Sequence, residues 1–505
     1  MALKHTRKNY PEWYQDVIIA ADMAELSASP GCMIIKPWGY GIWERIQREL
    51  DDKIKETGHE NAYFPLFIPL SFFKKEAKHV AGFAKEMAVV THSRLKKNEN
   101  GQLVPDGQLE EPLIVRPTSE TIIADSFSKW VRSYRDLPLM INQWANVVRW
   151  EMRPRIFLRS REFLWQEGHT VHATFDEAQA EAQKMLSVYI DLCENYLAIP
   201  CIPGKKPEYD KFAGAVDTYT VEQMMQDGRA LQGGTSHFLG QTFAKSGNIQ
   251  FQNAEGKMEY AYTTSWGVTT RLIGGIIMSH ADDEGMVVPP RVAPYQVVIV
   301  PMDKDKSKTE QVNAYAQQLA QRLSSLSVFS GKMRVKVDTR AKDSVDKFWE
   351  WTRKGVPLIC EVGPRDVDSG NVMVRVRLDI NTPAGKKIMS LDSFVEQASS
   401  LLENLQKRLF DNAKKRLEEH IRTDIKTPEE FEAYFKNQNV WVEQTEKPVL
   451  AFVKGKWCGD SETEEKMKEM KISIRCLPFE QSGTEGVCLL TGKPATLDVI
   501  YARSY

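Results

Sequence analysis

A short segment between Arg149 and His172 carries the densest group of side chains that could do chemistry. Its second half alternates as a β-strand does, and this period of two would place on one face Arg159, Arg161, Phe163, Trp165, Glu167 and His169. An ordinary half-buried strand keeps apolar residues on one face, whereas both faces are mixed here. Arginines beside a large aromatic ring suit a polyanion that carries a base, such as a nucleotide. The alternative is a strand with a salt-bridged surface, because charge runs usually only solvate a face.

Three further groups of residues could contribute to the same site. Thr118, Ser119 and Glu120 stand at a predicted helix start, where hydroxyl and carboxylate groups also serve as plain helix caps. The segment from Gln232 to His237 contains a Gly-Gly pair, which lets the backbone approach a ligand but can also be a tight turn. Arg271 lies at the mouth of an apolar segment, where arginine is an uncommon core residue.

Common nucleotide-binding signatures are absent from the sequence. It contains neither the glycine-lysine phosphate loop nor the glycine triplet of dinucleotide-binding folds, and it has no Ser or Cys nucleophile motif. A bound nucleotide would therefore lie on an antiparallel sheet among arginines, and not on a glycine loop at a helix start.

Length and composition indicate a large multidomain protein. The 505 residues predict about three domains, and 42% apolar residues suffice for real cores. No apolar run approaches about 18 residues, and residues 1–9 are polar and basic, so we expect no membrane span, no signal peptide and a cytoplasmic location. The seven scattered cysteines favour free thiols in a reducing compartment. The net charge of -1 means that any contact with nucleic acid must come from local patches.

Periodicity and turn residues predict the elements that would position these side chains. We expect helices over 9–26, 37–58, from 117 and over 174–196, a proline-broken strand at 62–69, a hairpin at 87–116, strands at 139–151 and 156–172, and short strands over 200–265. The helix over 37–58 and the strand after it could be ordinary core packing, or a surface where two copies of the chain meet.

The proline-rich segment 288–294 is the clearest domain boundary. Beyond it, strands and helices alternate through residue 377, which predicts a small α/β domain with a mixed sheet. A helix over about 390–422, a capped helix at Thr427 and an α+β module over 440–505 follow. We therefore expect domains at 1–287, 288–403 and 404–505.

Four blocks of residues, taken in order, resemble a known family. Arg149-x-Glu151 and Phe163-x-x-x-Glu167 resemble motif 2 of the class II aminoacyl-tRNA synthetases, and the helix over 37–58 with the strand that follows it resembles motif 1. Within that superfamily, essentially the whole chain is similar to the prolyl-tRNA synthetases, most closely at residues 116–120, 163–169, 232–237 and 265–271. The resemblance implies an α+β catalytic domain on an antiparallel sheet, an α/β anticodon-binding domain and a small α+β C-terminal module.

The resemblance also implies roles for individual residues. Those that match proline contacts or the walls of the proline pocket are Thr118, Glu120, Arg149, Trp165, His169, Phe212 and His237. Those that match ATP contacts are Arg149, Glu151, Arg159, Ser160, Phe163, Gln232, Thr235, Thr269 and Arg271, with Gln232 also near a magnesium ion. In the anticodon-binding domain, a set of charged residues could read base edges or could form a surface ion-pair network: Glu361, Arg365 and Asp366, followed by Arg375 and Arg377.

The implied reaction uses ATP and Mg²⁺ as cofactors, with L-proline and tRNA(Pro) as partners, in a homodimer. The proline carboxylate attacks the α-phosphate of ATP, pyrophosphate leaves, and the prolyl adenylate then acylates the terminal adenosine of the tRNA. Such chemistry depends on positioning and charge neutralisation, which accounts for an arginine-rich site without a nucleophile. Two alternatives are a synthetase for another amino acid and a catalytically silent paralogue that binds tRNA or a protein.

Two departures from the family pattern concern the subtype and zinc. About sixty residues separate His172 from Gln232, too few for the large editing insertion of bacterial-type members, so the chain resembles the archaeal and eukaryotic-like type. Relatives often hold zinc in the C-terminal module with paired cysteines. This chain has instead Cys458, Cys476 and Cys488, with Val453 where the first ligand is expected. A structural zinc site needs four ligands, so no zinc is expected.

Overall fold

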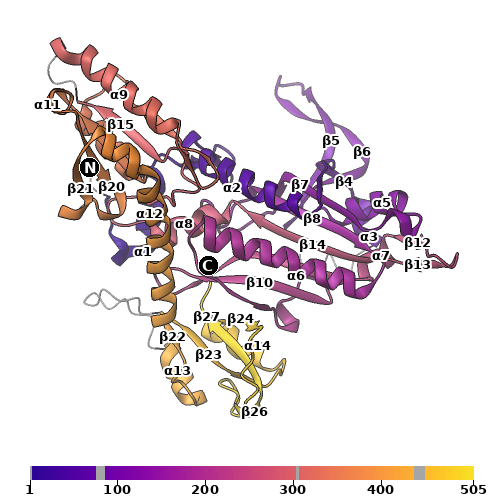
Figure 1. Ribbon diagram of the computed structural model, residues 1–505. Helices are drawn as coiled ribbons and strands as arrows, with labels where there is room; N and C mark the ends of the chain where they lie inside the picture. Colours follow the sequence, from indigo (N-terminus) through magenta and orange to yellow (C-terminus); the bar gives the residue numbers. More distant parts are fainter. Residues whose placement is uncertain (1–2, 76–85, 303–305, 437–449) are drawn as a thin grey trace.

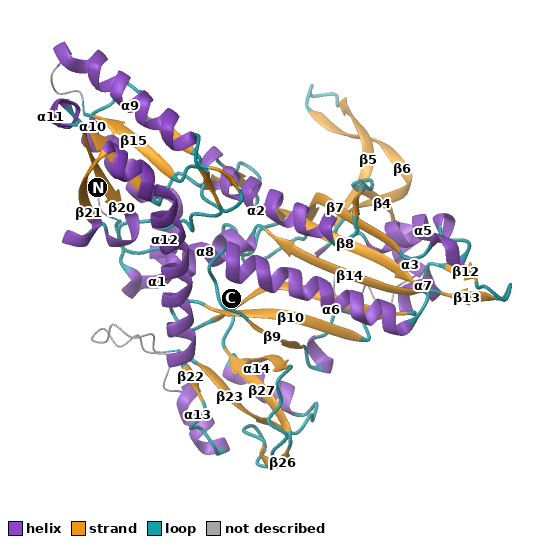
Figure 2. Ribbon diagram, in the orientation of Figure 1, coloured by secondary structure: helices purple, strands orange, loops and turns teal. Residues whose placement is uncertain are grey.

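The computed structural model describes residues 3–75, 86–302, 306–436 and 450–505, which form three parts (Figure 1). A large body is built on a long sheet, a smaller α/β part lies beside it, and a C-terminal module lies at the far end of helix α12 (Leu391–Glu419). Figure 2 shows adjacent strands dominating the body, with helices laid across them. Within the described ranges, every helix is too short or too polar to span a bilayer.

An eleven-stranded sheet forms the centre of the molecule, in the order β22-β23-β27-β24-β9-β10-β11-β14-β8-β7-β3. From β9 to β7 all neighbours are antiparallel, which confirms the antiparallel sheet of the expected fold class. Helices α6 (Phe175–Asp191) and α8 (Arg271–His280) pack against β11 and β14. The central strands are β7 (Leu139–Val148), β8 (Glu162–His172), β9 (Ile202–Lys205), β10 (Asp217–Met224), β11 (Ala230–Gly240) and β14 (Tyr262–Thr269).

The first two predicted helices form, but the first is shorter than its pattern predicts. Helix α1 (Tyr10–Ala20) gives way to the short strands β1 (Ala24–Leu26) and β2 (Met33–Ile35). Helix α2 (Pro37–Glu56) buries apolar side chains at every fourth position, and Gly58, with a φ of 91°, follows its end.

The strand predicted over 62–69 is wrong in extent. Strand β3 (Glu60–Asn61) joins the central sheet, whereas β4 (Phe67–Pro69) pairs with β6 (Leu103–Val115) in a separate three-stranded sheet. The predicted hairpin is confirmed as β5 (Ala88–Lys97) and β6, and it projects from the body (Figure 1). The remaining elements of the body are α3 (Leu70–Lys75), α5 (Glu120–Trp130), α7 (Thr242–Ser246), β12 (Gln250–Gln252) and β13 (Met258–Tyr260).

The strand predicted over 156–172 begins only at Glu162. Before it, Phe157 has a φ of 63°, and Arg155 and Arg159 form a single bridge, so residues 156–161 make a compact loop. The period of two therefore holds from Phe163 onward and does not place Arg159 or Arg161.

The α/β part confirms the predicted mixed sheet, in the order β18-β15-β19-β20-β21. The first three strands are parallel and the last three antiparallel, and α10 (Ser344–Arg353) has the predicted bounds. The other elements are β15 (Val297–Pro301), α9 (Thr309–Ser324), β16 (Ser327–Val328), β17 (Gly331–Lys332), β18 (Val335–Val337), β19 (Leu358–Val362), α11 (Pro364–Ser369), β20 (Asn371–Val376) and β21 (Lys386–Ser390).

The C-terminal module extends the central sheet, because β24 (Ser473–Pro478) pairs with β9. Its other elements are β22 (Ile421–Arg422), α13 (Pro428–Lys436), β23 (Phe452–Trp457), α14 (Thr463–Met470), β25 (Gly486–Val487), β26 (Pro494–Ala495) and β27 (Leu497–Ala502). Helix α12 continues through residue 403, so the boundary expected between 403 and 404 falls inside a helix. Residues 440–449 of the predicted module lie outside the described residues.

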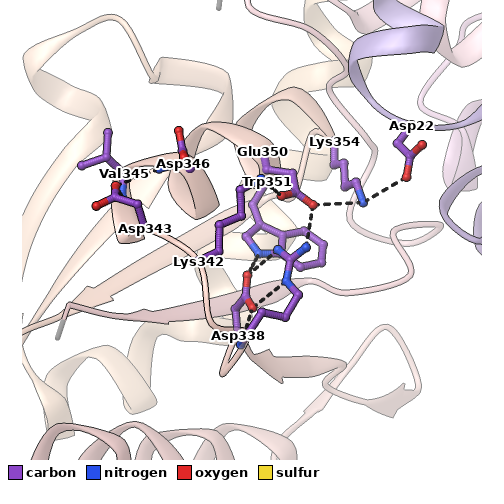
Figure 3. Close-up of polar contacts among 10 residues, drawn as sticks. Asp22, Asp338, Lys342, Asp343, Val345, Asp346, Glu350, Trp351 and Lys354 are labelled. Carbon is purple, nitrogen blue, oxygen red and sulfur yellow. Dashed lines mark hydrogen bonds and ion pairs between the residues drawn. The ribbon is translucent and has the colours of Figure 1, made fainter. Parts of the chain in front are cut away.

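Ion pairs join the α/β part to the body. Arg377 is 1% exposed and forms a bidentate pair with Asp282 across the junction, at 2.6 and 2.8 Å. Elsewhere along the junction, Lys354 lies between Glu350 and Asp22, with Nζ–O distances of 3.6 and 3.9 Å (Figure 3). Arg377 cannot read a base, because its guanidinium is buried and paired with Asp282.

We expect the change Arg377→Met to lower the free energy of unfolding by about 3 kcal/mol, because it leaves Asp282 without its buried partner. Urea denaturation measures this difference. The matched control is Arg322→Met, whose ion pair with Asp392 is solvent-exposed and should contribute less than about 1 kcal/mol. Equal effects of the two changes would contradict a structural role for Arg377.

The buried His280 on α8 makes stability depend on pH. Its ring lies 2.8 Å from the Leu197 carbonyl oxygen, and burial lowers its pKa to about 4, with a smaller contribution from Arg416. An unfolded histidine titrates near pH 6.5, so the unfolded chain binds the extra proton and stability falls as the pH drops from about 6.5 to about 4.

We expect His280→Gln, which keeps a donor for Leu197, to reduce this slope by up to about 1.4 kcal/mol per pH unit. Urea denaturation of both proteins between pH 4.5 and 6.5 measures the slope. An unchanged slope would show that folding does not lower the pKa of His280.

Candidate active site

The predicted site residues surround one cavity of about 390 Å³ on the central sheet. Each of them lines it: Thr118, Glu120, Arg149, Glu151, Arg159, Ser160, Phe163, Trp165, His169, Phe212, Gln232, Thr235, His237, Thr269 and Arg271. They come from β8, β11, β14, the starts of α5 and α8, and the loops before β8 and β10. Segments far apart in the sequence therefore meet at a single site.

Strand β8 forms the floor of the cavity. Phe163, Trp165, Glu167 and His169 line the cavity at alternate positions, as the period of two predicts. On the other face the Gln166 side-chain amide is hydrogen-bonded to the Tyr189 hydroxyl of α6 at 2.7 Å. The strand thus presents one face to the cavity and packs the other against a helix.

Three guanidinium groups gather at one end of the cavity. Arg149 donates from Nε to the Pro117 carbonyl oxygen at 2.9 Å and lies over the Phe163 and Trp165 rings at 5.7 and 5.6 Å. Arg271 is the first residue of α8, and burial followed by the charges of Arg159 and Arg149 lowers its pKa to about 10. Such mutual repulsion indicates that this end of the cavity suits a polyanion.

The loop before β8 holds Arg159 and Glu151 together and directs Arg161 elsewhere. Arg159 Nη1 lies 3.8 Å from Glu151 Oε2, and its Nη2 donates to the C-terminal Tyr505 at 3.0 Å. Arg161 donates to the Pro30 carbonyl at 2.9 Å and lies over Trp150 at 4.5 Å. The prediction that Arg161 shares a face with Phe163 is therefore wrong, because the strand starts after it.

Carboxylates gather at the other end of the cavity. Glu167 accepts hydrogen bonds from Ser119 and from Gln143 Nε2 at 2.7 Å, and it lies 3.0 Å from His169 Nε2. Burial lowers the pKa of His169, but Glu167 and the charge of Glu120 outweigh burial and raise it. This end of the cavity therefore favours a cation.

The contacts at the start of α5 distinguish the two interpretations of Thr118, Ser119 and Glu120, as helix caps or as residues of the cavity. Ser119 is the N-cap residue but makes no side-chain cap hydrogen bond; its hydroxyl donates to Glu167. Thr118 donates to the Glu120 carboxylate. These side chains serve the cavity network, so the capping alternative is not what the structure shows.

Aromatic rings close the acidic end. Phe212 stacks on His237 with centroids 4.6 Å apart and an interplanar angle of 28°. Burial, with a smaller contribution from His169, lowers the pKa of His237 to about 3, so it stays neutral. A flat aromatic wall thus lies beside charged groups at this end of the cavity.

The remaining predicted residues lie on β11 and around β14. Gln232 is paired in register with Glu222 of β10, and Thr235 with Gly267 of β14. The Thr269 hydroxyl accepts from the Arg271 backbone at 3.0 Å, and the Ser160 hydroxyl donates to the Glu162 carbonyl at 2.8 Å. The last two side chains therefore shape the cavity through backbone contacts.

Sequence reasoning missed part of the cavity lining, namely Glu86, Lys206, Asp210 and Lys211. Lys206, Asp210 and Lys211 stand shortly before the predicted pocket residue Phe212 in the sequence, and this adjacency was a usable signal, whereas nothing in the sequence pointed to Glu86. Sequence reasoning treated Glu167 as part of the floor but did not foresee its hydrogen bonds to Ser119 and Gln143.

The anticodon candidates are brought together only in part. Glu361 accepts from Arg375 Nε at 2.7 Å, and Asp366 accepts from the Gly363 backbone at 2.8 Å as the cap of α11. Glu361 is therefore part of an ion pair, as the alternative interpretation expected, and Asp366 caps a helix. Arg365 is the second residue of α11.

Comparison with protein families divides the chain into three matches. The tRNA synthetase class II core domain (G, H, P, S and T) matches residues 104–280, the anticodon binding domain matches residues 296–401, and the prolyl-tRNA synthetase C-terminal domain matches residues 442–505. Their order agrees with the three parts of the structure.

Several curated relatives match from end to end. Proline–tRNA ligases from Protochlamydia amoebophila and Paramagnetospirillum magneticum are 57% and 56% identical over all of this chain and over 98% and 99% of their own lengths. The proline–tRNA ligase of Bdellovibrio bacteriovorus is 53% identical over all of this chain and 99% of its own length. With these identities and the cavity described above, the chain belongs to the prolyl-tRNA synthetase family of class II aminoacyl-tRNA synthetases.

Proposed function

We propose that the cavity binds ATP at its arginine end and L-proline at its carboxylate end, and that this protein ligates proline to tRNA(Pro). The single observation that carries the assignment is the charge division of one cavity. Arg159 and Arg271 lie toward one substrate and Glu120 and Glu167 toward the other, with Arg149 at the boundary, where it interacts with Glu120 and Glu167 as well as with Arg271. A nucleotide triphosphate and an amino acid need these opposite environments side by side.

The first half-reaction joins the two substrates. A proline carboxylate oxygen forms a bond with the α-phosphorus of ATP, the α–β phosphoanhydride bond breaks, and pyrophosphate leaves with the electron pair. Arg149, Arg159 and Arg271 neutralise the charge that the phosphates carry in the transition state. The cavity holds both substrates in line, which replaces the need for a covalent nucleophile.

In the second half-reaction, a ribose hydroxyl of the terminal tRNA adenosine forms an ester with the prolyl carbonyl carbon, and AMP leaves. We assign tRNA binding to the anticodon-binding domain, with Glu361, Arg365 and Asp366 near the bases. The Asp366 carboxylate also accepts a hydrogen bond from the Gly363 backbone at the start of α11. Under this assignment it would contact a base from the beginning of that helix.

We assign the roles of the pocket residues from the family resemblance, and their chemistry is consistent with these roles. Glu120 and Glu167 pair with the secondary ammonium of proline, and Thr118 orients Glu120. Trp165, His169, Phe212 and His237 enclose the ring. Glu151 faces the adenine amino group, Phe163 and Arg271 lie on either side of the base, and Ser160, Gln232, Thr235 and Thr269 contact ATP. Such a pocket rejects larger residues well but alanine only by about 1 to 3 kcal/mol.

Magnesium fits the site as an ion that the nucleotide brings. Gln232 offers an amide oxygen, while the neighbouring Glu222 is committed to Lys206 and Arg475. No group of three or more metal-binding side chains occurs among the described residues. Mg²⁺ commonly uses one or two protein oxygens together with substrate phosphates, so Gln232 with the phosphates of ATP would hold it and neutralise their charge.

We further propose an archaeal and eukaryotic-like subtype, a homodimer and a cytoplasmic location. The subtype is supported by the segment between His172 and Gln232, which α6, β9 and β10 fill without an additional domain. The homodimer is supported by the likeness of α2 and the strand after it to motif 1. The location is supported by the free cysteines and by the substrates.

We expect Arg149→Ala to lower adenylate formation about a hundredfold or more, because it removes one charge-stabilising group. Proline-dependent exchange of pyrophosphate into ATP measures this step. The matched control is Arg153→Ala on the same loop, which is exposed and does not line the cavity. Near-normal exchange in Arg149→Ala would contradict the assignment of the arginine end to ATP.

The C-terminal module should hold no structural zinc, because its cysteines do not form a four-ligand set. Cys458 Sγ lies 3.7 Å from the Thr491 hydroxyl, and Cys476 is buried on β24. Metal analysis of dialysed protein should find well below one zinc per chain, and one zinc per chain would overturn this expectation.

A further inference from the structure

We propose that the C-terminal module positions the wall of the proline pocket, and that Arg475 of β24 is a positioning residue for proline binding. The loop between β9 and β10, residues 206–216, carries this wall. This inference rests on the proposed assignment of Phe212 to the proline pocket, and it explains what holds Phe212 in place.

The loop reaches the cavity with four side chains: Lys206, Asp210, Lys211 and Phe212. Phe212 stacks on His237, and its backbone N–H donates to the Thr218 hydroxyl at 2.9 Å. Neither contact fixes the far side of the loop, which faces the C-terminal module. The Phe212 ring also stacks on Phe243, with centroids 6.2 Å apart. The course of the loop that carries Phe212 depends in addition on what holds Lys206, Tyr209 and Asp210.

A buried chain of charges links the module to this loop. Arg475 donates to Glu222 of β10, with Nε and Nη2 both 2.9 Å from Oε2. Lys206 Nζ lies 3.0 Å from Glu222 Oε1 and 3.0 Å from Asp210 Oδ2. The side chains of Glu222, Lys206 and Arg475 are only 0%, 4% and 9% exposed. At such burial these three groups cannot exchange their partners for water. Asp210, whose side chain is 44% exposed, is the outer end of the chain.

Glu222 is the centre of this chain. Burial raises its pKa, but the charges and hydrogen bonds of Arg475 and Lys206 outweigh burial and lower it to about 2. The Thr220 hydroxyl donates to the same carboxylate at 2.8 Å. Glu222 is therefore charged at neutral pH, and loss of Arg475 would leave Lys206 as its single cationic partner among these contacts. Lys206 would then move toward Glu222 and away from Asp210, which draws the loop with it.

The module makes further contacts with the same loop and with the strand before it. The Tyr209 hydroxyl accepts from the Ile474 backbone at 3.2 Å, and its ring lies 6.3 Å from Trp457 at an angle of 84°. Strand β24 pairs with β9 directly before the loop, at Leu477 with Lys205. This close pairing needs Gly204, because a Cβ there would lie 2.4 Å from the Leu477 carbonyl oxygen. The module thus holds both the entry of the loop and its middle.

The test is the change Arg475→Met in the full-length protein, followed by proline-dependent pyrophosphate exchange. We expect the KM for proline to rise about tenfold and the KM for ATP to change much less, because Arg475 and Glu222 act on Arg271 only through longer-range charge, whereas Glu222 is paired directly with Lys206 of the loop. The matched control is Arg422→Met in the same module, whose exposed pair with Asp424 faces no cavity residue. A loss of general stability would lower activity without separating the two KM values.

A double-mutant cycle with Phe212→Ala tests the route of the effect. If Arg475 acts through the wall, Arg475→Met should add little to the proline KM once Phe212 is absent. Full additivity would overturn the proposal. Arg475→Lys, which keeps the charge at Glu222, should recover part of the lost proline binding.

A milder variant covers the case in which Arg475→Met does not fold. Tyr209→Phe removes only the hydroxyl that accepts from Ile474 and should raise the proline KM about two- to threefold. An unchanged proline KM in a folded Arg475→Met protein, or in Tyr209→Phe if the former does not fold, overturns the proposal. If Phe212→Ala itself leaves the proline KM unchanged, the pocket assignment fails, and the positioning role fails with it.

Discussion

The antiparallel pairing of β8 with β7 and β14 is the constraint on which the site depends. It keeps ten consecutive residues of β7 in register with β8, from Leu139 with Val171 to Val148 with Glu162. Because side chains alternate along a paired strand, this register places Phe163, Trp165, Glu167 and His169 on the cavity face. A slip of one residue would send all four to the helix side, so the sheet sets the chemistry of the floor.

Opposite charges divide the cavity that this sheet creates. Arginines from the loop before β8 and from the start of α8 meet at one end, and carboxylates from α5 and β8 meet at the other. Burial and the neighbouring Arg159 and Arg149 lower the pKa of Arg271. Burial also lowers the pKa of His169, but Glu167 and Glu120 outweigh burial and raise it. Charges at such positions interact more strongly than on a surface. This separation of arginines from carboxylates explains how the cavity can join a nucleotide to an amino acid without a covalent nucleophile.

The sequence predicts which residues meet in one cavity better than it predicts how the parts join. Local periodicity was enough for α2, α10 and the alternation from Phe163 to His169, because each depends on near neighbours in the chain. It failed for Arg161, because the start of a strand is set by its partner strands and not by its own alternation. Resemblance in four blocks located the distant residues that no local pattern could bring together. Neither source could indicate that β24 continues the central sheet, or that Arg377 is buried against Asp282, since both depend on packing between parts.

The central claim is that the two ends of one cavity bind ATP and L-proline for their joining. Pyrophosphate exchange into ATP, run with the unaltered protein and each of the twenty amino acids in turn, tests this claim most directly. The account predicts that proline supports rapid exchange, that alanine supports weak exchange, and that the larger amino acids support none. Exchange driven by a different amino acid, or no exchange with any of them while tRNA still binds, would contradict it.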